Sequence, residues 1–193
     1  MLEPLVFLKG GCVLTQPGNG EEAEQDEGKS GDRFLVLMRH GIAEDRTDAK
    51  PDEERALTDE GNDRMKGIGR GLAQLFPKAE IIYSSPLVRC VQTSLWLSKS
   101  YGDRVGVKTT HALVPSASPD DLRQLLEQLK EHRRIVLVGH EPTLSRDMAS
   151  LAGMVGMYPF ELKKGGCYGL RIPAGSSALL EWVLTPKVLR RLR

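Results

Sequence analysis

The chain is poor in the residues that would place it outside ordinary soluble globular proteins. Only three of its 193 residues are cysteines, widely separated at Cys12, Cys90 and Cys167. This odd, scattered set argues against a disulfide framework and a zinc cluster, and it predicts a protein of the reducing cytoplasm. No apolar run approaches the roughly 20 residues of a membrane span. The start of the chain also lacks the basic segment and apolar stretch of a secretory leader, so we expect no membrane contact.

A large excess of charge of one sign is also absent. The formal net charge of +1 argues neither for nor against nucleic acid. The part after residue 31 carries 20 acids and 25 bases, a net of +5, which is well short of a polybasic surface, so we expect no nucleic-acid partner. The charge is nevertheless uneven, because residues 1–31 contain six acids and two bases, for a net of −4, and the remainder is mildly basic. A mild excess of positive charge on the folded part suits an anionic substrate.

The length of the chain predicts one domain preceded by an extension. Residues 16–32 are rich in glycine and glutamate, contain no large apolar residue, and therefore predict a flexible linker. Residues 1–15 are more apolar, and either a loose strand on the domain or a disordered segment fits them. We place the boundary between an acidic extension, 1–31, and a folded domain, 32–193.

Short apolar runs alternate with helical patterns through most of the domain. Residues 34–38, 81–83 and 135–138 are continuous apolar runs typical of buried strands. We expect helices to begin at Thr58, at Ser85-Pro86, at Ser118 and at Pro142. The stripe Val88, Val91 and Leu95 is the expected buried face of the second helix.

The alternation predicts an α/β fold, a three-layer sandwich with a largely parallel central sheet and helices on both faces. The final third differs, because residues 160–162, 167–172 and 179–184 read as strands with no helices between them. These strands are expected to add antiparallel pairing at one edge.

Two of the predicted strands end in histidine. The first runs into Arg39-His40-Gly41, and the last parallel strand runs into Gly139-His140. Ligands of open α/β sheets bind beyond the carboxyl ends of the strands, so both histidines are placed where a site is expected. Arg89 lies in the first turn of a helix that follows another strand, and its side chain leans back toward the same edge.

This combination predicts an anion pocket. Arginine presents planar forks of donors that match phosphate oxygens, and a neutral imidazole is a good nucleophile. Each residue alone also has a plain structural role: His140 as a polar cap of a strand, Arg89 as a surface residue of a helix. The convergence of His40, Arg39, Arg89 and His140 favours phosphate as the ligand, with no metal or cofactor, because fixed cations supply the charge.

The segments LVLMRHG, LTDEG, SSPLVRCVQT and VLVGHEP occur in this order. In the order and the content of these segments, the chain resembles the histidine phosphatase superfamily from about residue 34 to the C-terminus. Within this superfamily the chain is most similar to the SixA-type phosphohistidine phosphatases. It shares their short length, the stretch ELKKGG and the lack of a large inserted cap. The resemblance implies that His40 becomes phosphorylated, and that Arg39, Arg89 and His140 complete the phosphate pocket.

One feature departs from that family. Many members place a carboxylic general acid after the arginine-bearing helix, but residues 111–118 contain no carboxylate. Asp120 and Asp121 come slightly later, and we interpret them as acids of a first helical turn. Glu141 fits either an acid of the site or a residue at a helix start.

Other phosphate chemistries lack their signatures. No cysteine is followed six positions later by arginine, no Asp-x-Asp pair occurs, and no Gly-x-x-x-x-Gly-Lys loop is present. We therefore expect a metal-independent phosphohydrolase whose partner is a phosphohistidine protein in signalling. A phosphatase for a small ester such as a sugar phosphate, and a phosphate-binding module without turnover, are the alternatives. Nothing in the sequence indicates an oligomeric state.

Overall fold

The computed structural model describes residues 31–154 and 161–192. The predicted linker and the segment 1–15 therefore lie outside the described residues, apart from the last two positions of the linker. A six-stranded sheet forms the middle layer, in the order β3-β2-β4-β1-β5-β6. The strands are β1 (Arg33–Arg39), β2 (Ile81–Ser84), β3 (Val107–Thr109), β4 (Arg134–Gly139), β5 (Cys167–Ile172) and β6 (Leu179–Leu184). The first four are parallel to one another, and β5 runs antiparallel to both of its neighbours, β1 and β6.

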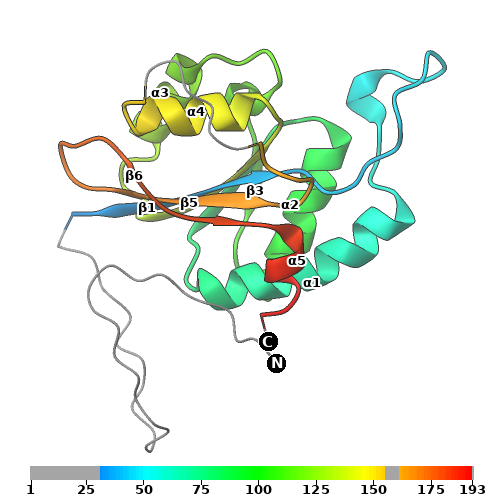
Figure 1. The fold of residues 1–193 in the computed structure, drawn as a ribbon, viewed down its shortest axis with the longest axis horizontal. Coiled ribbons are helices and arrows are strands. Elements are labelled where there is room, and N and C mark those ends of the chain that lie inside the picture. Colours follow the sequence, from blue (N-terminus) through cyan, green and yellow to red (C-terminus); the bar gives the residue numbers. More distant parts are fainter. Residues whose placement is uncertain (1–30, 155–160, 193) are drawn as a thin grey trace, which may run out of the picture.

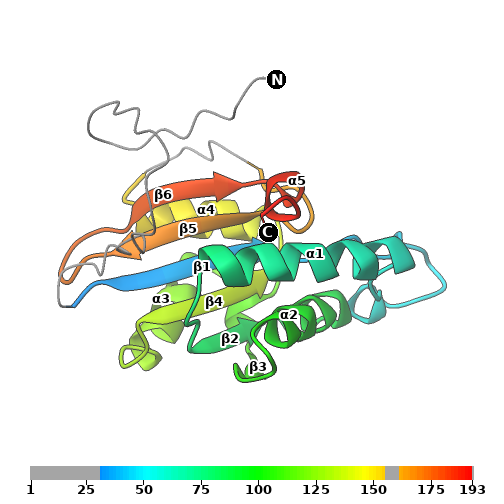
Figure 2. The same ribbon diagram turned by 90° about the horizontal axis from the view of Figure 1, so that it is seen from below.

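Helices cover both faces of this sheet (Figures 1 and 2). One face carries α1 (Asp59–Leu75), α2 (Val88–Ser100) and α5 (Pro186–Leu189), and the other carries α3 (Pro119–Gln128) and α4 (Thr143–Leu151). This confirms the predicted three-layer α/β sandwich with antiparallel strands at one edge. None of the described helices is long and apolar enough to cross a lipid bilayer.

The buried strands are apolar throughout because both of their faces are covered. Along β1, Leu35 and Leu37 point into the core beneath α3 and α4, and Val36 and Met38 point into the core beneath α1 and α2. A strand with one face in water would alternate apolar and polar residues instead. The uninterrupted run in the sequence is thus a consequence of the two helical layers.

The predicted helix starts are confirmed at three positions and wrong at the fourth. Pro142 is the N-cap residue of α4, as predicted. Thr58 accepts a hydrogen bond from the Gly61 amide at α1, and Ser118 forms a capping box with Asp121 at α3. At α2, however, helical geometry begins at Val88, and Ser85 does not cap the helix. The Ser85 hydroxyl instead faces the ring of a buried histidine, as described below.

The predicted buried face of α2 is also wrong. Leu95 is exposed, and the buried residues are Arg89, Cys90, Thr93, Ser94 and Leu97. Thr93 is buried on this face because its hydroxyl is satisfied locally: Oγ1 donates to the Arg89 carbonyl at 2.7 Å and accepts from the Gly41 amide at 3.0 Å. A pattern based on hydrophobicity alone therefore selects the wrong side.

The C-terminal third matches the prediction only in part. The strands β5 and β6 are confirmed, but Glu161 and Leu162 lie in an irregular segment, and residue 160 is outside the described residues. That segment is irregular because its groups bond to site residues: the Leu162 amide donates to Glu141 and the Leu162 carbonyl accepts from Arg39. The short elements β3 and α5 have no counterpart in the prediction.

The contact between α1 and α5 depends on a glycine. A Cβ atom on Gly71 would lie 1.9 Å from the Leu189 carbonyl oxygen. Gly71→Ala is expected to lower the free energy of unfolding by roughly 1–3 kcal/mol, because this overpacking outweighs the better helix propensity of alanine. Gly106→Ala is the control, since nothing lies within 4 Å of a Cβ there. Urea unfolding of both variants tests this, and equal stabilities would contradict the close approach.

Candidate active site

The carboxyl ends of β1 and β4 lie side by side and bring two histidines together. Arg39 pairs in register with Gly139, and the His40 amide donates to the Gly139 carbonyl at 3.1 Å. The ring centroids of His40 and His140 are 5.2 Å apart, with the rings tilted by 59°. Two residues that are 100 positions apart in the sequence thus form one site.

His40 is held as a neutral ring whose Nε2 lone pair is available for reaction. Its Nδ1 lies 2.7 Å from the Gly41 carbonyl oxygen. Because a carbonyl only accepts, Nδ1 carries the proton and Nε2 keeps its lone pair. Burial lowers the pKa of His40 to about 3; the hydrogen bond to Gly41 opposes this shift, and the charges of Arg89 and Arg39 add to it. The ring is therefore unprotonated near neutrality.

His140 has both ring nitrogens engaged. Nδ1 lies 3.4 Å from an amino nitrogen of Arg89, and Nε2 lies 2.9 Å from the Ser85 hydroxyl oxygen. A guanidinium only donates, so Nδ1 accepts and Nε2 carries the proton toward Ser85. Cys90 also contacts this ring, with its Sγ 3.4 Å from Nε2. Burial, the neighbouring His40 and Arg89 lower the pKa of His140 to about 3.

Arg89 is a buried residue and not a surface residue of α2. It is 3% exposed. One amino nitrogen donates to the Asp52 carbonyl at 2.6 Å, and the other donates to Asp52 Oδ2 at 2.9 Å. Its Nε–H is buried and has no hydrogen-bond partner among the residues that the structure describes.

Arg39 reaches the irregular segment that precedes β5. Its guanidinium donates to Glu161 Oε1 at 3.1 Å and to the Leu162 carbonyl. Its Nε–H, like that of Arg89, is buried without a partner within the described part of the chain. Both predicted arginines therefore keep one unused donor in the interior.

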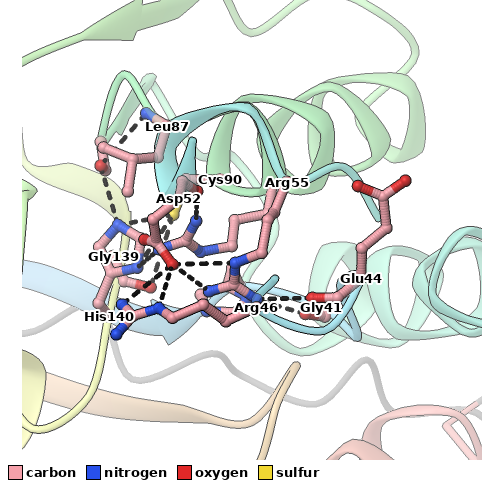
Figure 3. A network of polar contacts seen from close by, with 12 residues as sticks. Gly41, Glu44, Arg46, Asp52, Arg55, Leu87, Cys90, Gly139 and His140 are labelled. Atoms are coloured by element: carbon pink, nitrogen blue, oxygen red, sulfur yellow. Dashed lines mark hydrogen bonds and ion pairs between the residues drawn. The ribbon is translucent and has the colours of Figure 1, made fainter. Parts of the chain in front are cut away.

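Asp52 lies at this site and was missed by the sequence analysis. It accepts hydrogen bonds from Arg46, Arg55 and Arg89, and the dashed lines in Figure 3 converge on it. Partial burial raises the pKa of Asp52, but the hydrogen bonds from the three arginines outweigh this and hold it well below its usual range. No periodic pattern marks Asp52, which lies in a polar connection between β1 and α1. The only signal in the sequence is that it begins a run of four charged residues, 52–55.

The carboxylates considered as general acids are otherwise occupied. Glu141 Oε1 accepts from the Leu162 amide at 3.1 Å, and Oε2 accepts from the Ser145 amide at 3.3 Å. This geometry supports Glu141 as a helix-start residue. Asp121 belongs to the capping box of α3, and Asp120 pairs with Arg123, as expected of acids in a first helical turn. Among the described residues, no three His, Cys, Asp or Glu side chains gather in a way that would hold a metal ion.

Comparisons with known proteins identify the family of this chain. Residues 35–114 match the family model described as "Histidine phosphatase superfamily (branch 1)". An uncharacterized protein of Picosynechococcus sp. is 37% identical over 141 residues, which cover 71% of this chain and 84% of that protein.

Solved structures with low sequence identity share the fold. The protein histidine phosphatase SixA, solved with tungstate, superimposes with a TM-score of 0.72 at 20% identity, covering 81% of this chain and 99% of that one. A mycobacterial glucosyl-3-phosphoglycerate phosphatase superimposes with a TM-score of 0.62 at 17% identity, covering 78% and 97% of the two chains. At these identities the comparisons establish the architecture, and the two proteins act on different substrates.

Proposed function

The chain belongs to the histidine phosphatase superfamily, and from this we propose that it hydrolyses phosphohistidine in a protein through a phosphorylated His40. One observation carries the proposal. Two neutral histidines with centroids 5.2 Å apart are flanked by two arginines, each with a buried and unpaired Nε–H among the described residues. Buried donors without partners are costly, and an anion between the rings would satisfy both.

His40 is the nucleophile in this proposal. Its Nε2 lone pair attacks phosphorus in line, a new P–N bond forms, and the bond to the leaving nitrogen of the substrate breaks. Water then attacks the phosphorus of the phosphoenzyme, the bond to His40 breaks, and inorganic phosphate leaves. The hydrogen bond from Nδ1 to Gly41 orients the ring throughout.

Arg39, Arg89 and His140 hold the phosphoryl group. The two guanidinium groups offer fixed positive charge to oxygens whose charge redistributes in the transition state. The charge of Arg89 is shielded from solvent, because this residue is 3% exposed, and the Arg39 side chain is 20% exposed. We propose that the reaction therefore proceeds without a metal ion, and that EDTA leaves turnover intact.

The state of the carboxylates supports a P–N rather than a P–O substrate. Ester cleavage needs a proton donor for the departing alkoxide, and such an acid typically contributes about 10²–10⁴-fold. Asp52 is held ionised by three arginines, Glu141 accepts from two backbone amides, and Glu161 pairs with Arg39. A phosphoimidazole needs no such acid, because its second ring nitrogen takes a proton and the leaving group is neutral imidazole.

Substrate preference tests the proposal. We expect kcat/KM for a histidine-phosphorylated protein to exceed that for a phosphoserine peptide or a sugar phosphate by roughly 10²-fold or more at one pH. Glu141→Gln is the matched variant and should change the two activities by the same small factor. Equal or greater efficiency on an ester would move the chain to the small-ester phosphatases of this superfamily. An absence of turnover on every substrate, with phosphate still bound, would make it a binding module.

A further inference from the structure

The two edges of the Arg89 guanidinium face different groups. The edge formed by its two amino nitrogens is held by Asp52, through the backbone carbonyl at 2.6 Å and through Oδ2 at 2.9 Å. The other edge, formed by Nε and one amino nitrogen, faces His140, with the amino nitrogen 3.4 Å from Nδ1. The Nε–H on that edge has no partner within the described residues. One edge is thus fully used, and the other still has a free donor beside the histidine pair.

We propose that Asp52 is a positioning residue that holds Arg89 by its outer edge and so presents the inner edge to the phosphoryl group. This assignment rests on the proposed function, since it concerns the same phosphate pocket. An arginine side chain has several rotatable bonds, and fixing its planar fork before binding lowers the ordering cost of recognition. Asp52 grips the fork with both a main-chain and a side-chain oxygen, which fixes its plane as well as its position.

Two further arginines explain how a carboxylate can contact a phosphate-binding residue without cancelling its charge. Asp52 Oδ1 also accepts from Arg46 at 3.0 Å and from Arg55 at 2.9 Å. Three guanidinium charges against one carboxylate leave the cluster with a net charge of +2. Because of this surplus, Asp52 can orient Arg89 while the site stays attractive to a phosphate dianion.

Hydrogen bonds within the connection between β1 and α1 hold the backbone around Asp52 in place. Arg55 donates to the Glu44 carbonyl at 2.6 Å, and Glu44 Oε2 accepts from the Ala56 amide at 3.1 Å. The two sides of the connection are therefore tied to each other beside the site (Figure 3). This arrangement favours a rigid support for Arg89 over a loose surface loop.

The direction of a binding change separates positioning from simple electrostatics. Removing a carboxylate beside an anion site should strengthen phosphate binding through Coulomb's law alone. If Asp52 positions Arg89, Asp52→Ala should instead weaken inorganic phosphate binding and raise KM, each by about 10- to 100-fold, the range seen when a residue that orients a metal ligand is removed. Isothermal titration with inorganic phosphate and steady-state kinetics on the full chain measure both. Asp52→Asn should fall between, because its amide oxygen still accepts a hydrogen bond.

Two controls keep the result specific. Asp48→Asn removes the same charge from an exposed position of the same connection and should change neither constant. In an Arg89→Lys background, Asp52→Ala should have no further effect, because Asp52 acts through Arg89. Tighter phosphate binding by Asp52→Ala, or an unchanged affinity, would overturn the assignment, as would an equal loss in the Arg89→Lys background. If Asp52→Ala does not fold, the phosphate affinity of Asp52→Asn decides: weaker binding supports the assignment, and tighter or unchanged binding overturns it. Failure of the wild-type chain to bind phosphate would instead reject the proposed function.

Discussion

His40→Ala is expected to lower kcat on phosphohistidine by at least about 10⁴-fold, because loss of a nucleophile removes the covalent route altogether. Arg39, Arg89 and His140 remain in this variant, so inorganic phosphate should still bind, although more weakly. The measurement is a single-turnover assay beside a phosphate titration. A variant that binds and turns over like the wild type would exclude His40 as the nucleophile.

Trapping the intermediate completes this test. Wild-type enzyme mixed with labelled substrate and quenched without acid should carry phosphate on His40, and His40→Ala should carry none. His132→Ala is the matched control, because His132 is a partly exposed histidine beside Glu80, at the start of β4 and away from the paired strand ends. Label on a cysteine or an aspartate would contradict the mechanism.

Asp147→Asn is expected to stabilise the protein at pH 8 by about 2–4 kcal/mol. Asp147 lies on α4, is fully buried, and has no hydrogen-bond partner for either carboxylate oxygen among the described residues. Burial raises its pKa from 3.8 to about 7; the charge of Arg146 opposes this, and Glu141 adds to it. Ionisation at pH 8 therefore costs the folded state free energy that asparagine avoids.

The raised pKa of Asp147 determines how the stability of the protein changes with pH. Between the unfolded value of 3.8 and the folded value of about 7, the folded chain keeps a proton that the unfolded chain has released. Stability is thus lost as the pH rises through this window, and the advantage of Asp147→Asn should shrink steadily from pH 8 toward pH 4. Urea unfolding at four pH values measures it, with the exposed Asp45→Asn as the control. An advantage that does not vary with pH would show that the Asp147 carboxylate is not the cause.

The sequence predicts the parts of the fold that repeat a simple pattern. The runs at β1 and β4 are apolar on both faces, and parallel pairing places their ends together, so the proximity of His40 and His140 follows from topology. The predicted stripe on α2 is wrong because the buried face of this helix includes polar residues, and hydropathy cannot recognise a hydroxyl such as that of Thr93, which is hydrogen-bonded within the helix.

The position of Asp52 at the site could not be predicted from the sequence. Its position depends on the path of the connection between β1 and α1, where the only helical element, a 3-10 turn at Asp52–Glu54, is too short to leave a periodic pattern in the sequence. A carboxylate among three arginines is a tertiary feature, since Arg89 is 37 positions away. The sequence predicts a phosphate-binding role for Arg89, but it does not point to Asp52, which holds this side chain.

The placement of β1 has a consequence for the synthesis of the protein. β1 hydrogen-bonds to β4 on one side and to β5 on the other, and to neither of the next two strands in the chain. A nascent chain that has passed His40 must still add 100 residues to reach His140. Until then β1 is an apolar segment with two open edges, a species that chaperones bind and that aggregates readily. The pair formed by His40 and His140 therefore cannot assemble until both β1 and β4 have been synthesised.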